Sequence, residues 1–188
     1  LASAARNFYL ASNEAGETNH APGVWASFKA STLTIESAYG TGAPPVGIYL
    51  NLTMGTVLTN AMSNLDTQDT TQYVCAGWSM TGNDPGSGSE TQMVMTVTND
   101  AVLTWLWTTN YWLAATAGLH GVVAGGTGWV ALGSTTQLMA IADQYYHFTN
   151  WTGDASGTTN PLDLLMDAAK SVTANFAANL TTNLPTPE

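Results

Sequence analysis

The side chains best suited to chemistry are one thiol and three imidazoles. Cys75 is the single cysteine, so it cannot form a disulfide within the chain, and its apolar surroundings favour a buried, inert thiol. His20, His120 and His147 have none of the spacings that a zinc site uses. Motifs of serine hydrolases, zinc proteases and nucleotide-binding loops are missing from the sequence. We therefore expect no catalytic residues, no cofactor and no enzymatic activity.

Two glycine-rich loops carry oxygen atoms of the kind that Ca²⁺ accepts as ligands. Asp84 and Glu90 lie in the first loop, and Asp154 lies in the second. Neither loop has the dense carboxylate spacing of a calcium-binding loop, and Asp in a turn commonly bonds to its own backbone. We expect these residues to shape turns, and they remain calcium candidates only.

The seven tryptophans are the second group of side chains that can contact a ligand. Trp78 and Trp151 end apolar runs in two similar stretches, and we expect both to be core residues. Trp105, Trp112 and Trp129 have two interpretations. They form either a rigid joint between domains or an exposed surface on which sugar rings stack.

Composition limits the classes of partner. The chain has 188 residues and a net charge of −10, and only 9% of its residues are charged, whereas about 25% is usual. Such a chain repels phosphate backbones, so we exclude nucleic acid as a partner. Its 45% hydrophobic residues predict a folded core, and no apolar run reaches the roughly 18 residues of a membrane span. The chain opens at Leu1 without Met, so we expect that any targeting peptide was removed or lies outside this sequence.

The elements that must position these residues are β-strands. Apolar, β-branched and aromatic residues alternate with polar ones over short runs, namely 33–35, 73–75, 93–97, 103–107 and 172–176. Clusters of Gly, Pro, Asn and Ser separate the runs and predict hairpin loops, as at 125–128. Residues 162–169 fit either a helical turn or a hairpin. The sequence predicts a mainly β protein.

Two stretches of the chain match in order and spacing, which indicates a tandem repeat. Residues 33–37 open the first copy as residues 112–116 open the second, and the two copies then continue through Trp78 and Trp151. We predict a first domain at 31–112 and a second at 113–178. An N-terminal arm at 1–30 precedes them, and a polar tail at 179–188 follows.

A third fragment lies in the arm. Residues 24–30 have the pattern V-x-A-x-F-x-A, which residues 172–178 share. One interpretation is the relic of a preceding repeat. The other is an exchangeable strand that seeks the sheet edge of another molecule, with Val24, Trp25, Ala26 and Phe28 as assembly residues.

The second copy resembles a known family. Residues 146–157, together with Met166-Asp167 and residues 170–176, resemble the divergent internalin B-type (InlB) B-repeat, and residues 119–129 resemble its first hairpin. Residues 33–112 resemble a longer variant with insertions around 40–45 and 63–71. The resemblance implies β-grasp-like modules of secreted or surface-anchored bacterial proteins, and it transfers no catalytic residue.

Two functions fit these observations. The first is an extracellular structural protein, a segment or self-assembling subunit of a bacterial surface fibre, filament or adhesin stalk, joined by donation of the N-terminal strand. Its partner is another copy of the chain or a neighbouring repeat. The second is an accessory module that binds surface polysaccharide through its exposed tryptophans. An enzyme is the least supported interpretation.

Overall fold

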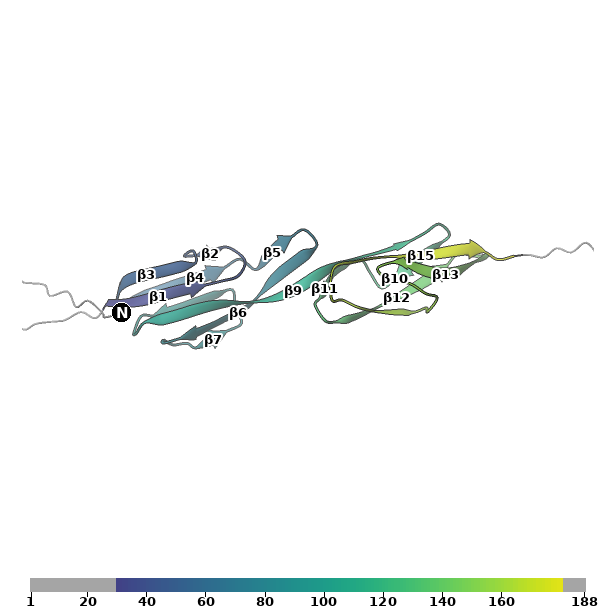
Figure 1. Ribbon diagram of the computed structural model, residues 1–188. Coiled ribbons are helices and arrows are strands. Elements are labelled where there is room, and N and C mark those ends of the chain that lie inside the picture. Colours follow the sequence, from purple (N-terminus) through teal and green to yellow (C-terminus); the bar gives the residue numbers. More distant parts are fainter. Residues whose placement is uncertain (1–29, 181–188) are drawn as a thin grey trace, which may run out of the picture. The chain divides into compact units, whose positions relative to one another are not determined.

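The computed structural model describes residues 30–180, which form strands and turns (Figure 1). No helix occurs within this range, which confirms the expectation of an all-β fold. The described residues accordingly offer no helix long and apolar enough to cross a membrane. The strands are β1 (Ala30–Glu36), β2 (Gly42–Ala43), β3 (Gly47–Thr53), β4 (Val57–Met62), β5 (Leu65–Gln68), β6 (Thr71–Thr81), β7 (Ser87–Gly88), β8 (Gln92–Thr96), β9 (Ala101–Ala117), β10 (Gly121–Ala124), β11 (Gly128–Ala131), β12 (Thr135–Ala142), β13 (Tyr146–Gly153), β14 (Leu162–Leu165) and β15 (Lys170–Ala178).

Four of the five predicted strand runs lie within strands of the structure, and the fifth, 93–97, extends one residue past the end of β8 at Thr96. The 125–128 cluster forms the turn between β10 and β11, but it is not the expected hairpin, because β10 pairs with β12 and β11 pairs with β9 in different sheets. The ambiguous segment 162–169 contains strand β14 and the turn into β15 and no helical turn. It is not a hairpin either, because β14 pairs with β12 and β15 pairs with β9 and β13. The arm at 1–29 and the tail from 181 onward lie outside the described residues.

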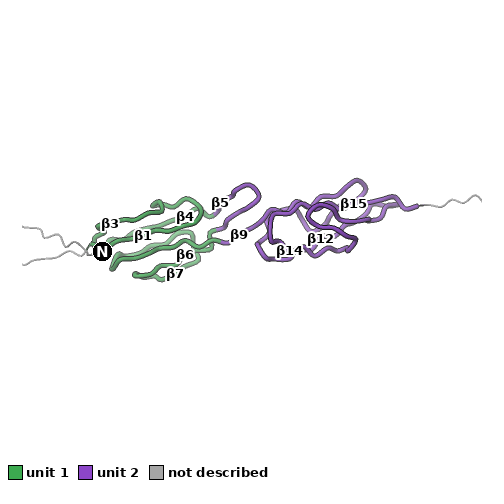
Figure 2. The backbone as a smooth tube through the Cα atoms, viewed as in Figure 1, with its two compact units in different colours: residues 1–64, 75–107 green, residues 65–74, 108–188 purple. Residues whose placement is uncertain are grey.

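The chain divides into two compact units (Figure 2). Of the described residues, unit 1 comprises 30–64 and 75–107, and unit 2 comprises 65–74 and 108–180. Strand β9 contributes residues to both units, with Trp107 as the last in unit 1 and Thr108 as the first in unit 2. The sequence analysis placed the domain boundary a few residues further along the same strand.

Unit 1 has two sheets. In the larger one, β1 pairs antiparallel with β3 and parallel with the first part of β9, and β6 pairs with β9 and β7. The smaller sheet has the order β2-β4-β8. The core contains the inward-facing residues of both sheets, including Leu33, Trp78 and Trp105. The thiol of Cys75 is buried among them, as the sequence indicated.

Unit 2 is built in the same way. The second part of β9 pairs antiparallel with β11 and parallel with β15, and β15 pairs antiparallel with β13. A smaller sheet has the order β10-β12-β14. The core includes Leu113, Leu138, Trp151 and Val172. Trp78 and Trp151 are 5% and 1% exposed, so both are core residues, as predicted.

The pairings of the two units correspond strand for strand, and they fix which residues are equivalent. In the parallel pairs, Leu33 lies opposite Ala101 in unit 1, and Leu113 lies opposite Lys170 in unit 2. Leu33 is therefore equivalent to Leu113, one residue beyond the Trp112 with which the sequence match aligned it. A shift of one residue along a strand reverses the face on which a side chain lies, so Trp112 lies on the face away from the core.

The hairpin of β5 and the start of β6 (residues 65–74) interrupts the residues of unit 1 but belongs to unit 2 (Figure 2). Leu65 pairs with Val74, and Cys75 N–H donates to the carbonyl of Asn64 at 2.9 Å. The sequence marked an insertion over 63–71. The structure shows that most of this insertion is a hairpin that adds to unit 2.

Candidate functional site

A pair of tryptophans lies on the sheet of unit 2. Trp112 of β9 and Trp129 of β11 are directly opposite each other in the antiparallel register. Their ring centroids are 5.2 Å apart and their planes meet at 71°. The neighbouring residues Leu113 and Val130 face the core, so both indoles lie on the opposite side of the sheet. Both are half-buried.

We call this side of the sheet β11-β9-β15-β13 the outer face of unit 2. Beside the indoles, the side-chain amide of Asn110 donates to Oε1 of Gln72 at 3.3 Å. The backbone N–H of Trp112 donates to the backbone carbonyl of Thr70 at 3.0 Å. Gln72 and Thr70 come from the hairpin 65–74. The hairpin thus fixes the backbone of the strand that carries Trp112.

Hydroxyl and amide groups continue across the outer face beyond the tryptophans. The hydroxyls of Thr116 and Thr173 are 2.8 Å apart, on β9 and β15. Asn175 donates through its amide to the hydroxyl of Thr152 at 3.1 Å. Neither residues 108–117 nor β11 contain Asp, Glu, Lys or Arg. These two parts of the outer face therefore carry no charged side chain.

These polar residues were missed by the sequence analysis. Their signal was the alternation with core residues along β15, where Val172 and Ala174 are buried and Thr173 and Asn175 are not. Alternation assigns a residue to a face but does not show which strands lie side by side. The grouping with the tryptophans required the order β11-β9-β15-β13.

Trp105 does not belong to this surface. It is 3% exposed and lies in the core of unit 1, so its indole offers no face to a ligand, which corrects its inclusion among the candidate ligand aromatics. Trp105 and Leu103 both lie on the inward side of β9, because residues two apart in a strand share a face. The assembly candidates Val24, Trp25, Ala26 and Phe28 lie outside the described residues.

The three calcium candidates lie in separate turns. Asp154 accepts a hydrogen bond from the backbone N–H of Ser171 at 2.7 Å, so its carboxylate has a structural partner. Asp84 and Glu90 are exposed, and the loop that contains Asp84 is held by the side chain of Asn83, which bonds to Thr96 and Thr98. Within residues 30–180, no three His, Cys, Asp or Glu side chains gather as metal ligands would.

The described histidines are likewise apart. His120 lies on an exposed turn, with its ring stacked on that of Tyr146 at a centroid distance of 3.9 Å. Nδ1 of His147 lies 3.0 Å from Oδ1 of Asn179. Each ring thus has a local partner in the fold.

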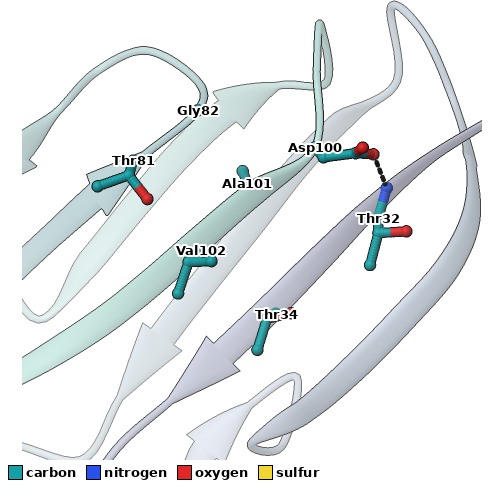
Figure 3. Close-up of a pocket in the computed structure, with 7 residues that line it drawn as sticks. All are labelled: Thr32, Thr34, Thr81, Gly82, Asp100, Ala101 and Val102. Atoms are coloured by element: carbon teal, nitrogen blue, oxygen red, sulfur yellow. Dashed lines mark hydrogen bonds between the residues drawn. The ribbon is translucent and has the colours of Figure 1, made fainter. Parts of the chain in front are cut away.

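A surface pocket of about 330 Å³ lies on unit 1 (Figure 3). Threonines line it, among them Thr32, Thr34 and Thr81, together with Asp100. Oδ1 of Asp100 accepts a hydrogen bond from the backbone N–H of Thr32 at 2.8 Å, which Figure 3 shows as a dashed line. Asp100 is the one titratable group among its lining residues, so the pocket lacks the pair of groups that acid–base catalysis uses.

Comparison with known proteins finds one family match, which covers part of the chain. Residues 111–180 match the model of the family described as the divergent InlB B-repeat domain, which confirms the resemblance seen in the second copy. This range lies in unit 2 and includes Trp112 and Trp129 but not the hairpin 65–74. The family is typical of bacterial surface proteins. No curated protein and no solved structure matches the chain.

Proposed function

Because residues 111–180 match the family model of the divergent InlB B-repeat domain, we propose that the chain is a non-catalytic structural segment of a bacterial cell-surface stalk or fibre. Repeat modules of this kind act by being joined in series rather than by enclosing a reaction site. The proposed location is the outside of the cell. Antibodies against residues 30–180 should then label intact cells, and labelling only after lysis would contradict the location.

The observation that carries this proposal is strand β9. Its 17 residues contribute to unit 1 up to Trp107 and to unit 2 from Thr108, with no linker residues between these two parts of the strand. Each unit has its own core. A join of this kind allows units to be added in series, as an extended surface protein requires.

We propose further that unit 1 is a second copy of the same repeat. Its strands pair in the same scheme as those of unit 2. The antiparallel pair β1–β3 corresponds to the pair formed by the second part of β9 with β11, and the pair β4–β8 corresponds to β12–β14. The hairpin 65–74 is the main addition. A loss of sequence similarity with retention of the pairing scheme is consistent with divergence between copies.

The finer proposal is self-assembly through the N-terminal strand. Both sides of β1 are paired, with β3 and with β9, so β1 itself offers no free edge to a further strand. Strand β3 ends the sheet of unit 1 and carries exposed Ile48 and Leu50, at 67% and 64%. An uncharged, apolar edge strand accepts a further strand readily. We propose that residues 24–29 of one copy pair with β3 of the next.

Size-exclusion chromatography with light scattering and negative-stain electron microscopy test this assembly. The full chain should give oligomers or filaments of regular width, and the chain without residues 1–29 should be monomeric. Filaments that persist after the deletion would overturn strand donation, and a monomeric full chain would overturn self-assembly.

A point variant tests the acceptor edge without shortening the chain. Ile48→Lys places a charge on β3 and should abolish assembly. Val94→Lys, at a 53% exposed position in the smaller sheet of unit 1, is the matched control and should assemble normally. Equal assembly by both variants would exclude β3 as the acceptor.

A further inference from the structure

We propose that the outer face of unit 2 binds a neutral polysaccharide, with the indoles of Trp112 and Trp129 as the platform for sugar rings. This site is distinct from the β3 edge of unit 1. It requires neither filament formation nor the N-terminal arm, so it can fail or succeed independently of the proposed structural function.

The geometry of the two rings suits a sugar ligand. Planes that meet at 71° form a corner in which a sugar ring can stack on one indole and touch the other at its side. Sugars present an apolar face of C–H groups, which packs on an aromatic ring, while their hydroxyls need polar partners. Among the described residues, neither Trp112 nor Trp129 has an acceptor for its indole N–H, so each N–H is available to a sugar oxygen.

The polar groups around the rings match hydroxyl-rich ligands. Asn110 lies beside Trp112 on β9, and Thr116 follows on the same face. Beyond them, Thr173 and Asn175 of β15 extend the row of hydroxyl and amide groups. Such groups both donate and accept hydrogen bonds, as sugar hydroxyls do. A binding site commonly combines aromatic surface with a few fixed polar groups of this kind.

Charge selects the class of polysaccharide. No Lys or Arg is present in residues 108–117 or in β11 to bind a carboxylate or sulfate, and Lys170 of β15 forms an ion pair with Asp167 at 2.7 Å. The net charge of the chain is −10, which repels anionic polymers. A neutral polymer is therefore the occupant that this surface favours.

Unit 1 has no such platform at the same position. Because Leu33 is equivalent to Leu113, the residue of unit 1 that corresponds to Trp112 is Thr32. Thr32 bonds to Asp100, whose carboxylate adds a negative charge there. The site is thus a property of unit 2 and not of the shared fold.

The experiment uses the full chain. Depletion assays employ microcrystalline cellulose, chitin and insoluble mannan, and affinity gel electrophoresis employs soluble β-glucan, galactomannan and, as the anionic polymer, alginate. The wild type should bind at least one neutral polymer and not alginate. Trp112→Ala and Trp129→Ala should each weaken that binding about tenfold or more, as truncation of a central aromatic contact does. Tyr145→Ala, which removes a 70% exposed aromatic from a turn, is the matched control and should bind normally.

Two further measurements keep the test decisive. Thr116→Val retains the shape of an exposed residue and removes its hydroxyl, so it should weaken binding severalfold even if a tryptophan variant fails to fold. Near-ultraviolet circular dichroism checks the fold of every variant. The proposal is overturned if no neutral polymer binds, if alginate binds best, or if folded tryptophan variants bind like the wild type. A change in oligomeric state without polysaccharide binding would assign the tryptophan pair to a protein contact and would also overturn it.

Discussion

Asn60 of unit 1 occupies the position that Leu138 occupies in unit 2. Each is the fourth residue of an equivalent central strand: Val57 of β4 pairs with Thr96, and Thr135 of β12 pairs with Leu165. Asn60 is 1% exposed and Leu138 is 0% exposed. The amide of Asn60 donates to Sδ of Met93 at 3.3 Å, but its Oδ1 has no hydrogen-bond donor. The same fold thus holds an unsatisfied polar group in one unit and an apolar one in the other.

The first prediction concerns this position. Asn60→Leu should raise the free energy of unfolding of unit 1 by about 1–2 kcal/mol, because it removes a buried acceptor without a donor and replaces a weak bond to sulfur. Calorimetry of the full chain measures the change. The reciprocal variant Leu138→Asn should lower the stability of unit 2 by about 2–4 kcal/mol. A destabilising Asn60→Leu would show that the amide has a required structural role.

The second prediction compares two glycines of one loop. Gly88 pairs with Trp78, and a Cβ at Gly88 would lie 2.6 Å from Cζ2 of that indole. Gly88→Ala should therefore cost about 1–3 kcal/mol through overpacking. A Cβ at Gly86 meets nothing closer than 3.9 Å, so Gly86→Ala should change stability by less than about 0.5 kcal/mol. Urea unfolding measures both, and equal effects would contradict the packing around Trp78.

The third prediction tests the independence of unit 2. A fragment of residues 108–180 contains the matched repeat and its core, so it should fold cooperatively. It lacks the hairpin 65–74, which supplies the carbonyl of Thr70 to Trp112 and the side chain of Gln72 to Asn110. We expect the fragment to be less stable than unit 2 in the full chain. Amide dispersion in nuclear magnetic resonance spectra checks folding, and an unfolded fragment would show that the hairpin is an essential element.

The fourth prediction is a pH dependence. The hydrogen bond from the Lys170 ammonium, at 2.7 Å, holds the pKa of the Asp167 carboxyl below its ordinary value of 3.8. Folding therefore favours the ionised carboxylate, so this contribution to stability is present above pH 3.8 and is lost as the pH falls through the lower folded-state pKa. Asp167→Asn should lower the melting temperature slightly at pH 7, and the difference should vanish in strong acid. Glu90→Gln is the control, and a difference that persists in acid would contradict the ion pair.

Much of the fold could be predicted from local patterns. Alternation along residues 103–107 and 172–176 marked strands, and glycine-rich clusters marked turns, because side-chain period and turn chemistry are properties of short segments. Trp78 and Trp151 each end an apolar run in one of two similar stretches of sequence, which indicated two similar cores. Residues 146–157 and 170–176 indicated the family of the second copy.

The register could not be read in the same way. The segment that begins at residue 33 matches the residue types of a segment that begins at 112 almost as well as one that begins at 113. The two alignments nevertheless place Trp112 on opposite faces of the sheet. The parallel pairing with β15 decides between them, because Leu113 lies opposite Lys170. For the same reason, Trp105 and Trp112 were treated alike in the sequence, although one is a core residue and the other is half-buried on the outer face.

The sequence by itself determined most of the strands, the low charge and the family that residues 111–180 resemble, since each depends on residue types and their local spacing. Tertiary structure alone decided that β9 contributes to two units, that the hairpin 65–74 belongs to unit 2, and that Trp112 lies opposite Trp129 and Thr116 opposite Thr173. These features depend on hydrogen bonds between strands far apart in the chain. Such pairings follow from the simultaneous burial of both cores, which no single segment encodes.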